Sequence, residues 1–211
     1  MIPNEFNEAL PPDNLVPELL ASIDEQITHF TASNVFNNVL KKKKNENQHT
    51  MAFCAFMNNY LKGSNLSLIF DRETSQKGSY AVDIGVLHTS GLLIFTIEAK
   101  ILPTPKGTKS SPRNKYEYVY GKSGGIQRFK NAQHGVDLED KNLPENGLIA
   151  YIKENDFPYW HTKINQWILD AKWHKSEQLQ KIHINTTAKF KSTHSRVDDS
   201  EIVLHHFWVN V

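Results

Sequence analysis

An apolar, β-branched stretch at residues 82–101, VDIGVLHTSGLLIFTIEAKI, places the strongest constraint on how this chain folds. The Thr-Ser-Gly sequence at its centre predicts two strands joined as a hairpin, with Ser90 and Gly91 as a two-residue turn. With that turn, residues whose numbers sum to 181 face each other, so Asp83 faces Glu98. A turn of another length would shift this register by one residue.

Side-chain alternation along the two strands gives the hairpin two different faces. Asp83, Glu98 and Lys100 share one face. Gly85, Ile94 and Thr96 complete that face, and the opposite face is formed by Val82, Ile84, Val86, Phe95, Ile97 and Ala99. The hairpin is therefore expected to pack on a core through its apolar face and to present charged groups on the other.

The facing carboxylates of Asp83 and Glu98 repel each other, and each resists ionisation unless a cation lies between them. Mg²⁺ (or Mn²⁺) would relieve this repulsion, because Mg²⁺ prefers oxygen ligands and is commonly held by one or two carboxylates together with substrate phosphate. We therefore expect Asp83 and Glu98 to bind the metal, with the carbonyl group of Ala99 as a third ligand. Lys100 would lie beside the metal-bound water, an arrangement suited to phosphodiester hydrolysis.

The rest of the chain predicts a mixed α/β fold. Helical periodicity over residues 17–42 indicates an N-terminal helical element, and a second helix is expected to end near Gly63. The elements expected after it are strands at 66–70, 80–88 and 92–101, a helix at 124–135, a strand at 147–152, a helix at 158–174 and a strand at 201–209. This order predicts a mixed sheet with helices on its faces.

Composition narrows the function classes only in part. The 24 Lys and Arg residues nearly balance the 23 Asp and Glu residues, so any polyanion must bind through a local cluster. The single cysteine, Cys54, has apolar neighbours and is interpreted as a packed, inert thiol in a reducing compartment. The sequence contains no signal peptide pattern and no apolar run of about 18 residues, so a cytoplasmic protein is expected.

The segments VDIG and IEAK, on the two strands of the hairpin, resemble the split Asp…Glu-x-Lys signature of the PD-(D/E)XK nuclease superfamily, which has the restriction-endonuclease-like fold. That family has an αβββαβ core, and the elements expected between Glu46 and Ile152 follow the same order. The resemblance implies Mg²⁺-dependent cleavage of DNA, less often of RNA. It also implies that Asp83 and Glu98 are metal ligands and that Lys100 is the catalytic lysine.

Further family features are matched in part. The first core helix of such nucleases often contributes an acidic residue, which corresponds here to Glu46. Some relatives carry a Gln-x-x-x-Tyr pattern on the helix after the lysine; Gln127 matches its glutamine, but Asn131 replaces the tyrosine. Val82 stands where the motif's name has proline. The resemblance divides the chain into an N-terminal helical extension, residues 1–45, and a restriction-endonuclease-like domain, residues 46–211.

A polar, basic segment follows the hairpin and is a candidate surface for nucleic acid, with DNA as the expected partner. Tyrosines alternate with its basic residues, and the glycines at 124 and 125 could let backbone amides approach a phosphate. The expected contacts are Lys106, Lys109, Arg113, Lys115, Lys122, Arg128 and Lys130. A solvated loop, with the glycines only marking the start of a helix, explains the same pattern. A homodimer is compatible with the family, and no membrane partner is expected.

Three other interpretations remain open. The chain could be a non-catalytic member of the fold that binds nucleic acid or protein. Glu98 and Lys100 could form a solvent-exposed cross-strand salt bridge with little energetic consequence. With a different hairpin register, the chain would be an unrelated α/β domain. A zinc site is not expected, because the 10 histidines and the lone cysteine lack zinc-binding spacing.

Overall fold

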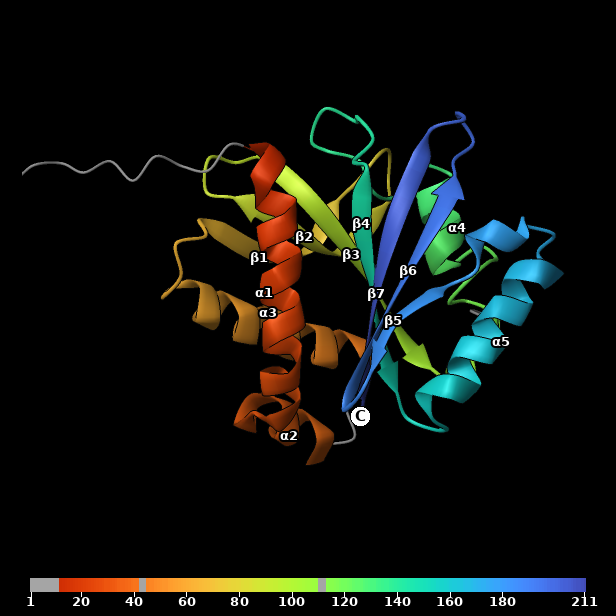
Figure 1. Ribbon diagram of the computed structural model, residues 1–211, viewed down its shortest axis with the longest axis horizontal. Helices are drawn as coiled ribbons and strands as arrows, with labels where there is room; N and C mark the ends of the chain where they lie inside the picture. The colour runs from red at the N-terminus through yellow and green to blue at the C-terminus, as the bar shows by residue number, and fades with distance from the viewer. Residues whose placement is uncertain (1–11, 42–44, 110–112) are drawn as a thin grey trace, which may run out of the picture.

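A seven-stranded mixed sheet with helices on both faces forms the protein (Figure 1). The computed structural model describes residues 12–41, 45–109 and 113–211. Three lysines of the basic run at 41–44, residues 42–44, lie outside the described residues. The mixed α/β class expected from the sequence is confirmed.

Side chains at the starts of several helices accept hydrogen bonds from backbone amides of the first turn. Asn45 and Gln48 form a capping box before the third helix, and Asp156 caps the fifth helix through the amide of Tyr159. Ser33 accepts a hydrogen bond from the amide of Phe36 and separates the single helical element expected at the N-terminus into two helices. The helices are α1 (Pro12–Ala32), α2 (Asn34–Lys41), α3 (Glu46–Leu61), α4 (Gly125–Lys130) and α5 (Phe157–Asp170), with a short 3₁₀ helix, η1, at Lys175–Glu177.

The strands lie in the order β1-β2-β3-β4-β7-β6-β5. They are β1 (Leu68–Ser75), β2 (Ala81–His88), β3 (Leu93–Leu102), β4 (Glu145–Ile152), β5 (Gln180–Ile184), β6 (Thr187–Ser195) and β7 (Glu201–Asn210). The pairs β3/β4 and β4/β7 are parallel, and the other pairs are antiparallel. The strands β5 and β6 were not expected from the sequence, and β1 continues to Ser75, beyond the strand expected at 66–70.

The β2–β3 hairpin has the predicted register near its charged residues but a different turn. Ile84 pairs with Ile97 and Val86 with Phe95, as predicted. The two-residue turn is wrong, because the amide of His88 donates to the carbonyl of Leu92 and the loop therefore has three residues, 89–91. A bulge between Val86 and Leu87 compensates for the extra residue and restores the register.

Each face of the sheet is covered by its own hydrophobic core. Ile84, Phe95 and Ile97 pack with residues of α1 and α3, including Ile23 of the predicted extension. The opposite core joins the sheet to α4, α5 and the segment that precedes α4. The charged face of the hairpin is thus buried, and the solvent-exposed salt bridge is wrong, since Glu98 is 1% and Lys100 5% exposed.

Candidate active site

The candidate site lies where β2 and β3 part. Their backbone pairing ends at Ile84 and Ile97, so the next outward-facing amides of β3 need other acceptors. The amide of Ala99 donates to Oδ2 of Asp83 at 2.7 Å, and the amide of Ile101 donates to Oε2 of Glu46 at 2.8 Å. Carboxylates from β2 and α3 therefore accept the backbone hydrogen bonds that this edge of β3 would otherwise leave unpaired. The carbonyl of Ala99 points to the same edge as its amide, toward Asp83.

Glu98 belongs to the same strand, but its carboxylate points into the buried layer beneath α4. Its Oε1 atom lies 2.5 Å from Nζ of Lys100 and 3.1 Å from Nη1 of Arg128. Its Oε2 atom lies 3.2 Å from Nδ1 of His134. Lys100 and Arg128 thus compensate the charge of Glu98. Asp83 and Glu98 were expected from the sequence to repel each other, and these partners were not predicted.

The shifted pKa values follow from burial and from these neighbours. Burial, and then the charge of Glu98, raise the pKa of Asp83 to about 7, although Lys100 acts in the opposite direction. Burial alone would raise the pKa of Glu98, but Lys100 and His134 lower it below its usual range. Burial would lower the pKa of Lys100, but Glu98, Glu46 and Asp83 raise it, so its ammonium group is charged at neutral pH.

The donors at this edge fit Mg²⁺ in their chemistry but are not assembled into a preformed site. Asp83, Glu46 and the carbonyl of Ala99 can supply the oxygen ligands that Mg²⁺ prefers. The raised pKa of Asp83 means that its ionised form is disfavoured here, and a bound cation would stabilise that form. Across the ranges 12–41, 45–109 and 113–211, no group of three or more His, Cys, Asp or Glu side chains is arranged to hold a metal ion. Glu98 could join Asp83 as a ligand only by giving up contacts to Lys100, Arg128 or His134.

The structure brings together Asp83, Glu98, Lys100 and Glu46 from the predicted set. Gln127, on α4, makes no hydrogen bond to these four among the described residues. Nε2 of Gln127 donates to Oδ1 of Asn131, its neighbour four residues along the chain, at 3.0 Å. Sequence reasoning missed His134, because it lies 36 residues after Glu98 with no local pattern joining them.

The predicted nucleic-acid contacts fall into two groups. Lys106, Lys109, Lys115 and Lys122 are exposed. The others make ion pairs: Arg113 with Glu117, Arg128 with Glu98 and Lys130 with Glu177. Arg113 also approaches Glu46, with Nη2 3.9 Å from Oε2.

A second buried polar cluster lies on the same face of the sheet. Ser192 Oγ is 2.7 Å from Nε2 of His194, and Nδ1 of His194 is 2.7 Å from Oε2 of Glu177. This order matches a nucleophile, a base and an acid, but Ser192 and His194 are each only 1% exposed, so a substrate could not reach them. Burial lowers the pKa of His194, which keeps the imidazole neutral in a structural role. Tyr118 and His206 extend the hydrogen-bonded chain.

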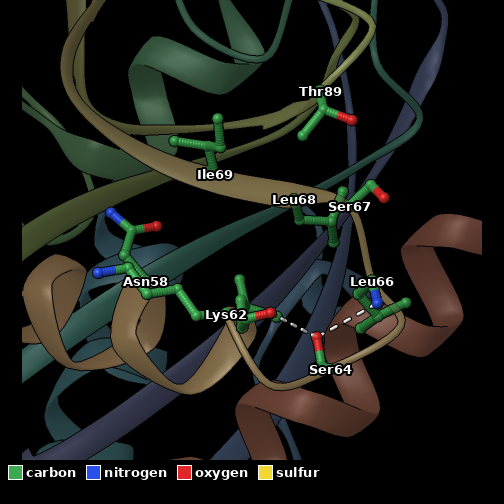
Figure 2. A pocket seen from close by; sticks show the side chains of 9 residues that line it. Asn58, Lys62, Ser64, Leu66, Ser67, Leu68, Ile69 and Thr89 are labelled. Carbon is green, nitrogen blue, oxygen red and sulfur yellow. Dashed lines mark hydrogen bonds between the residues drawn. The ribbon is translucent and has the colours of Figure 1, made fainter.

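Two cavities differ in their relation to the site. One cavity, of about 420 Å³, lies between the end of α3 and the start of β1 and contains no residue of the candidate site. Figure 2 shows residues that line it, among them Asn58, Lys62 and Ile69. Another, of about 360 Å³, is lined by Glu46, Ile101 and Arg113. This second cavity borders the edge of β3 at Ile101 and shares Glu46 with the candidate site.

Comparisons with other proteins found no match, so a function has to be argued from the side chains of the candidate site. No helix within the described part of the chain is long and apolar enough to cross a membrane. None of the protein-family models, curated proteins or solved structures compared with this chain matches it.

Proposed function

We propose that the protein is a Mg²⁺-dependent nuclease that hydrolyses phosphodiester bonds in DNA. One observation carries the proposal: the carboxylates of Asp83 and Glu46 bind the backbone of the β3 segment that no longer pairs with β2, and the buried ion pair of Glu98 with Lys100 is formed by side chains of that segment. Carboxylates that can bind a metal, beside a charged ammonium group, can assist metal-dependent phosphodiester hydrolysis.

The donor chemistry assigns a role to each residue. Asp83 and Glu98 would hold the metal with the carbonyl of Ala99, and Glu46 would support it from α3. Bound Mg²⁺ would polarise a phosphoryl oxygen and lower the pKa of a water molecule. Lys100, being charged, would stabilise negative charge on the phosphate and would not serve as a base.

The resemblance to PD-(D/E)XK nucleases adds support from the order of the elements. The chain runs α3, β1, β2, β3, α4, β4, and the Asp and the Glu-x-Lys residues occur on β2 and β3. We therefore also propose that the chain has a restriction-endonuclease-like core. We further propose that it acts in restriction, defence or DNA processing.

A non-catalytic nucleic-acid-binding protein of the same fold is the second candidate. It is favoured by the pairing of Glu98 with Lys100, Arg128 and His134, which balances the charge of Glu98 without a metal. A catalytic site would have to open this cluster, whereas a binding protein would keep it closed.

Cleavage assays distinguish the two candidates. Supercoiled plasmid and single-stranded DNA are incubated with Mg²⁺, with Mn²⁺ or with chelator, for the parent protein and for Asp83→Asn. Asp71→Asn, at an exposed position on β1, is the matched control. Metal-dependent cleavage that Asp83→Asn abolishes and Asp71→Asn retains supports the nuclease. DNA binding without cleavage under any of the metal conditions supports the binding protein.

A further inference from the structure

The cavity of about 360 Å³ beside the candidate site has a definite place in the fold. It lies at the carboxyl ends of the parallel strands β3 and β4, where Leu102 pairs with Ile152. The amide of Lys153, the first residue after β4, donates to the carbonyl of Leu102 at 2.7 Å. In α/β sheets, ligands bind in the crevice outside the carboxyl ends of such strands.

The start of α3 forms a second wall of the cavity, through Asn45, Glu46 and Asn47. The first turn of the 16-residue helix α3 carries partial positive charge that favours an anion, although the amide of Gln48 there already donates to the side chain of Asn45. Glu46 adds a negative charge, but its Oε2 atom is engaged by the amide of Ile101 at the edge of β3. The wall therefore combines an anion-favouring backbone with a carboxylate that faces the candidate site.

Lys153 and Arg113 supply the positive charges of the cavity. Arg113 is partly neutralised, since its Nη2 atom is 2.7 Å from Glu117 and 3.9 Å from Glu46. Lys153 is exposed and makes no ion pair with any other described residue. Of the two, Lys153 is the cation whose charge is available to a ligand.

We propose that this cavity binds a backbone phosphate of the nucleic-acid strand, next to the phosphate that lies at Asp83 and Lys100, with Lys153 as its principal contact. The inference rests on the proposed function, because it takes nucleic acid as the ligand. It adds a residue that the sequence did not single out, and it directs the strand across the carboxyl ends of β3 and β4. A phosphate held there would position the neighbouring phosphodiester for reaction without contributing base specificity.

The experiment measures binding rather than cleavage. Fluorescence anisotropy of a labelled single-stranded DNA is recorded in chelator over a series of salt concentrations. Lys153→Gln is expected to weaken binding about three- to tenfold at low salt and to reduce the slope of log K against log salt by about 0.7, the contribution of one phosphate contact on a single strand. Lys153→Arg should restore both values.

Lys62→Gln is the control, because Lys62 is an exposed lysine on the cavity of Figure 2, which shares no residue with the candidate site. A slope that Lys153→Gln leaves equal to that of the parent overturns the proposed phosphate site, even if the protein cleaves DNA. A reduced slope in a protein that never cleaves with metal supports the phosphate site and rejects the nuclease. Absence of DNA binding by the parent protein overturns the phosphate site, and the cleavage assay with metal decides separately on the nuclease.

Discussion

Nδ1 of His134 lies 3.2 Å from Oε2 of Glu98, in a layer where His134 is 0% and Glu98 1% exposed. The other oxygen of Glu98 already serves Lys100 and Arg128. Glu98 Oε2 has no hydrogen bond of good geometry within the described residues, but the imidazole lies within ion-pair distance of it. The interaction joins the segment after α4 to the central strand of the candidate site.

His134→Ala is therefore expected to remove the imidazole that lies 3.2 Å from Oε2 of Glu98 and to leave this oxygen buried without that neighbour. The free energy of unfolding, measured by urea denaturation at neutral pH, should fall by about 1–3 kcal/mol. His29→Ala, at an exposed position on α1, should change it by no more than about 0.5 kcal/mol. Equal stability of the two variants would show that His134 does not support Glu98.

Asp83→Asn is expected to stabilise the metal-free protein at high pH. The pKa of Asp83 is raised from 3.8 to about 7 in the folded state, chiefly by burial and then by Glu98. The protonated carboxyl favours folding, so its contribution is complete below about pH 4 and is lost as the pH rises through 7. Asparagine cannot ionise and retains an oxygen for the amide of Ala99.

Unfolding measured in chelator from pH 4 to pH 8 tests this expectation. The stability of Asp83→Asn should match that of the parent near pH 4 and exceed it by about 2–4 kcal/mol at pH 8. Asp71→Asn should show no such pH-dependent difference, because Asp71 is exposed. A difference that stays constant with pH would mean that the folded state does not disfavour ionised Asp83.

The first helix should unfold together with the sheet. Phe30 of α1 is 0% exposed, and its ring centroid lies 4.8 Å from that of Phe36 and 5.3 Å from that of Phe53. Phe30→Ala should lower the free energy of unfolding by about 3–5 kcal/mol while leaving a single transition. Glu25→Ala, exposed on the same helix, is the control. Two separate transitions would show that α1 forms an independent unit.

Asn58 protects the outer edge of β1. Its side chain accepts a hydrogen bond from the amide of Phe70 at 2.8 Å and donates one to the carbonyl of Phe70 at 2.8 Å. Figure 2 shows Asn58 on α3 beside the start of β1. An edge strand with unpaired backbone groups is open to pairing with another chain.

Asn58→Ala should lower the free energy of unfolding by about 1–3 kcal/mol. Light scattering should also show association that increases with protein concentration, because the freed edge can accept a strand. Asn65→Ala, in the exposed loop before β1, should remain as monodisperse as the parent. Unchanged scattering by Asn58→Ala would mean that the side chain is not what prevents pairing at this edge.

Local patterns in the sequence predicted much of the fold. Helical periodicity located α3 and α5, and the alternation around Asp83 and Glu98 predicted the register and the apolar face of the hairpin. The β5 and β6 strands escaped prediction because residues 180–195 mix Lys, His and Thr with few apolar side chains. The turn was wrong because a bulge and a longer loop give the same register as a shorter loop alone.

The environment of Glu98 could not be predicted, because it depends on contacts between distant segments. Gly125 starts α4 so close to the sheet that an added Cβ atom would lie 2.9 Å from Leu148 and 3.5 Å from Lys100. This close approach buries the charged face and brings Arg128 and His134 to Glu98. Neither the spacing nor the composition of residues 82–101 contains that information.

The closure of the β3 edge by two carboxylates makes two backbone amides into spectroscopic reporters. The amides of Ala99 and Ile101 donate to Asp83 and Glu46, so their nitrogen and proton chemical shifts depend on the charge state of those acids. Titration of Asp83 should move the Ala99 resonance, and arrival of a divalent cation should move both resonances, before any substrate is present. The chemical shifts of these two amides, followed by NMR in a metal titration, would therefore report whether a cation occupies the site.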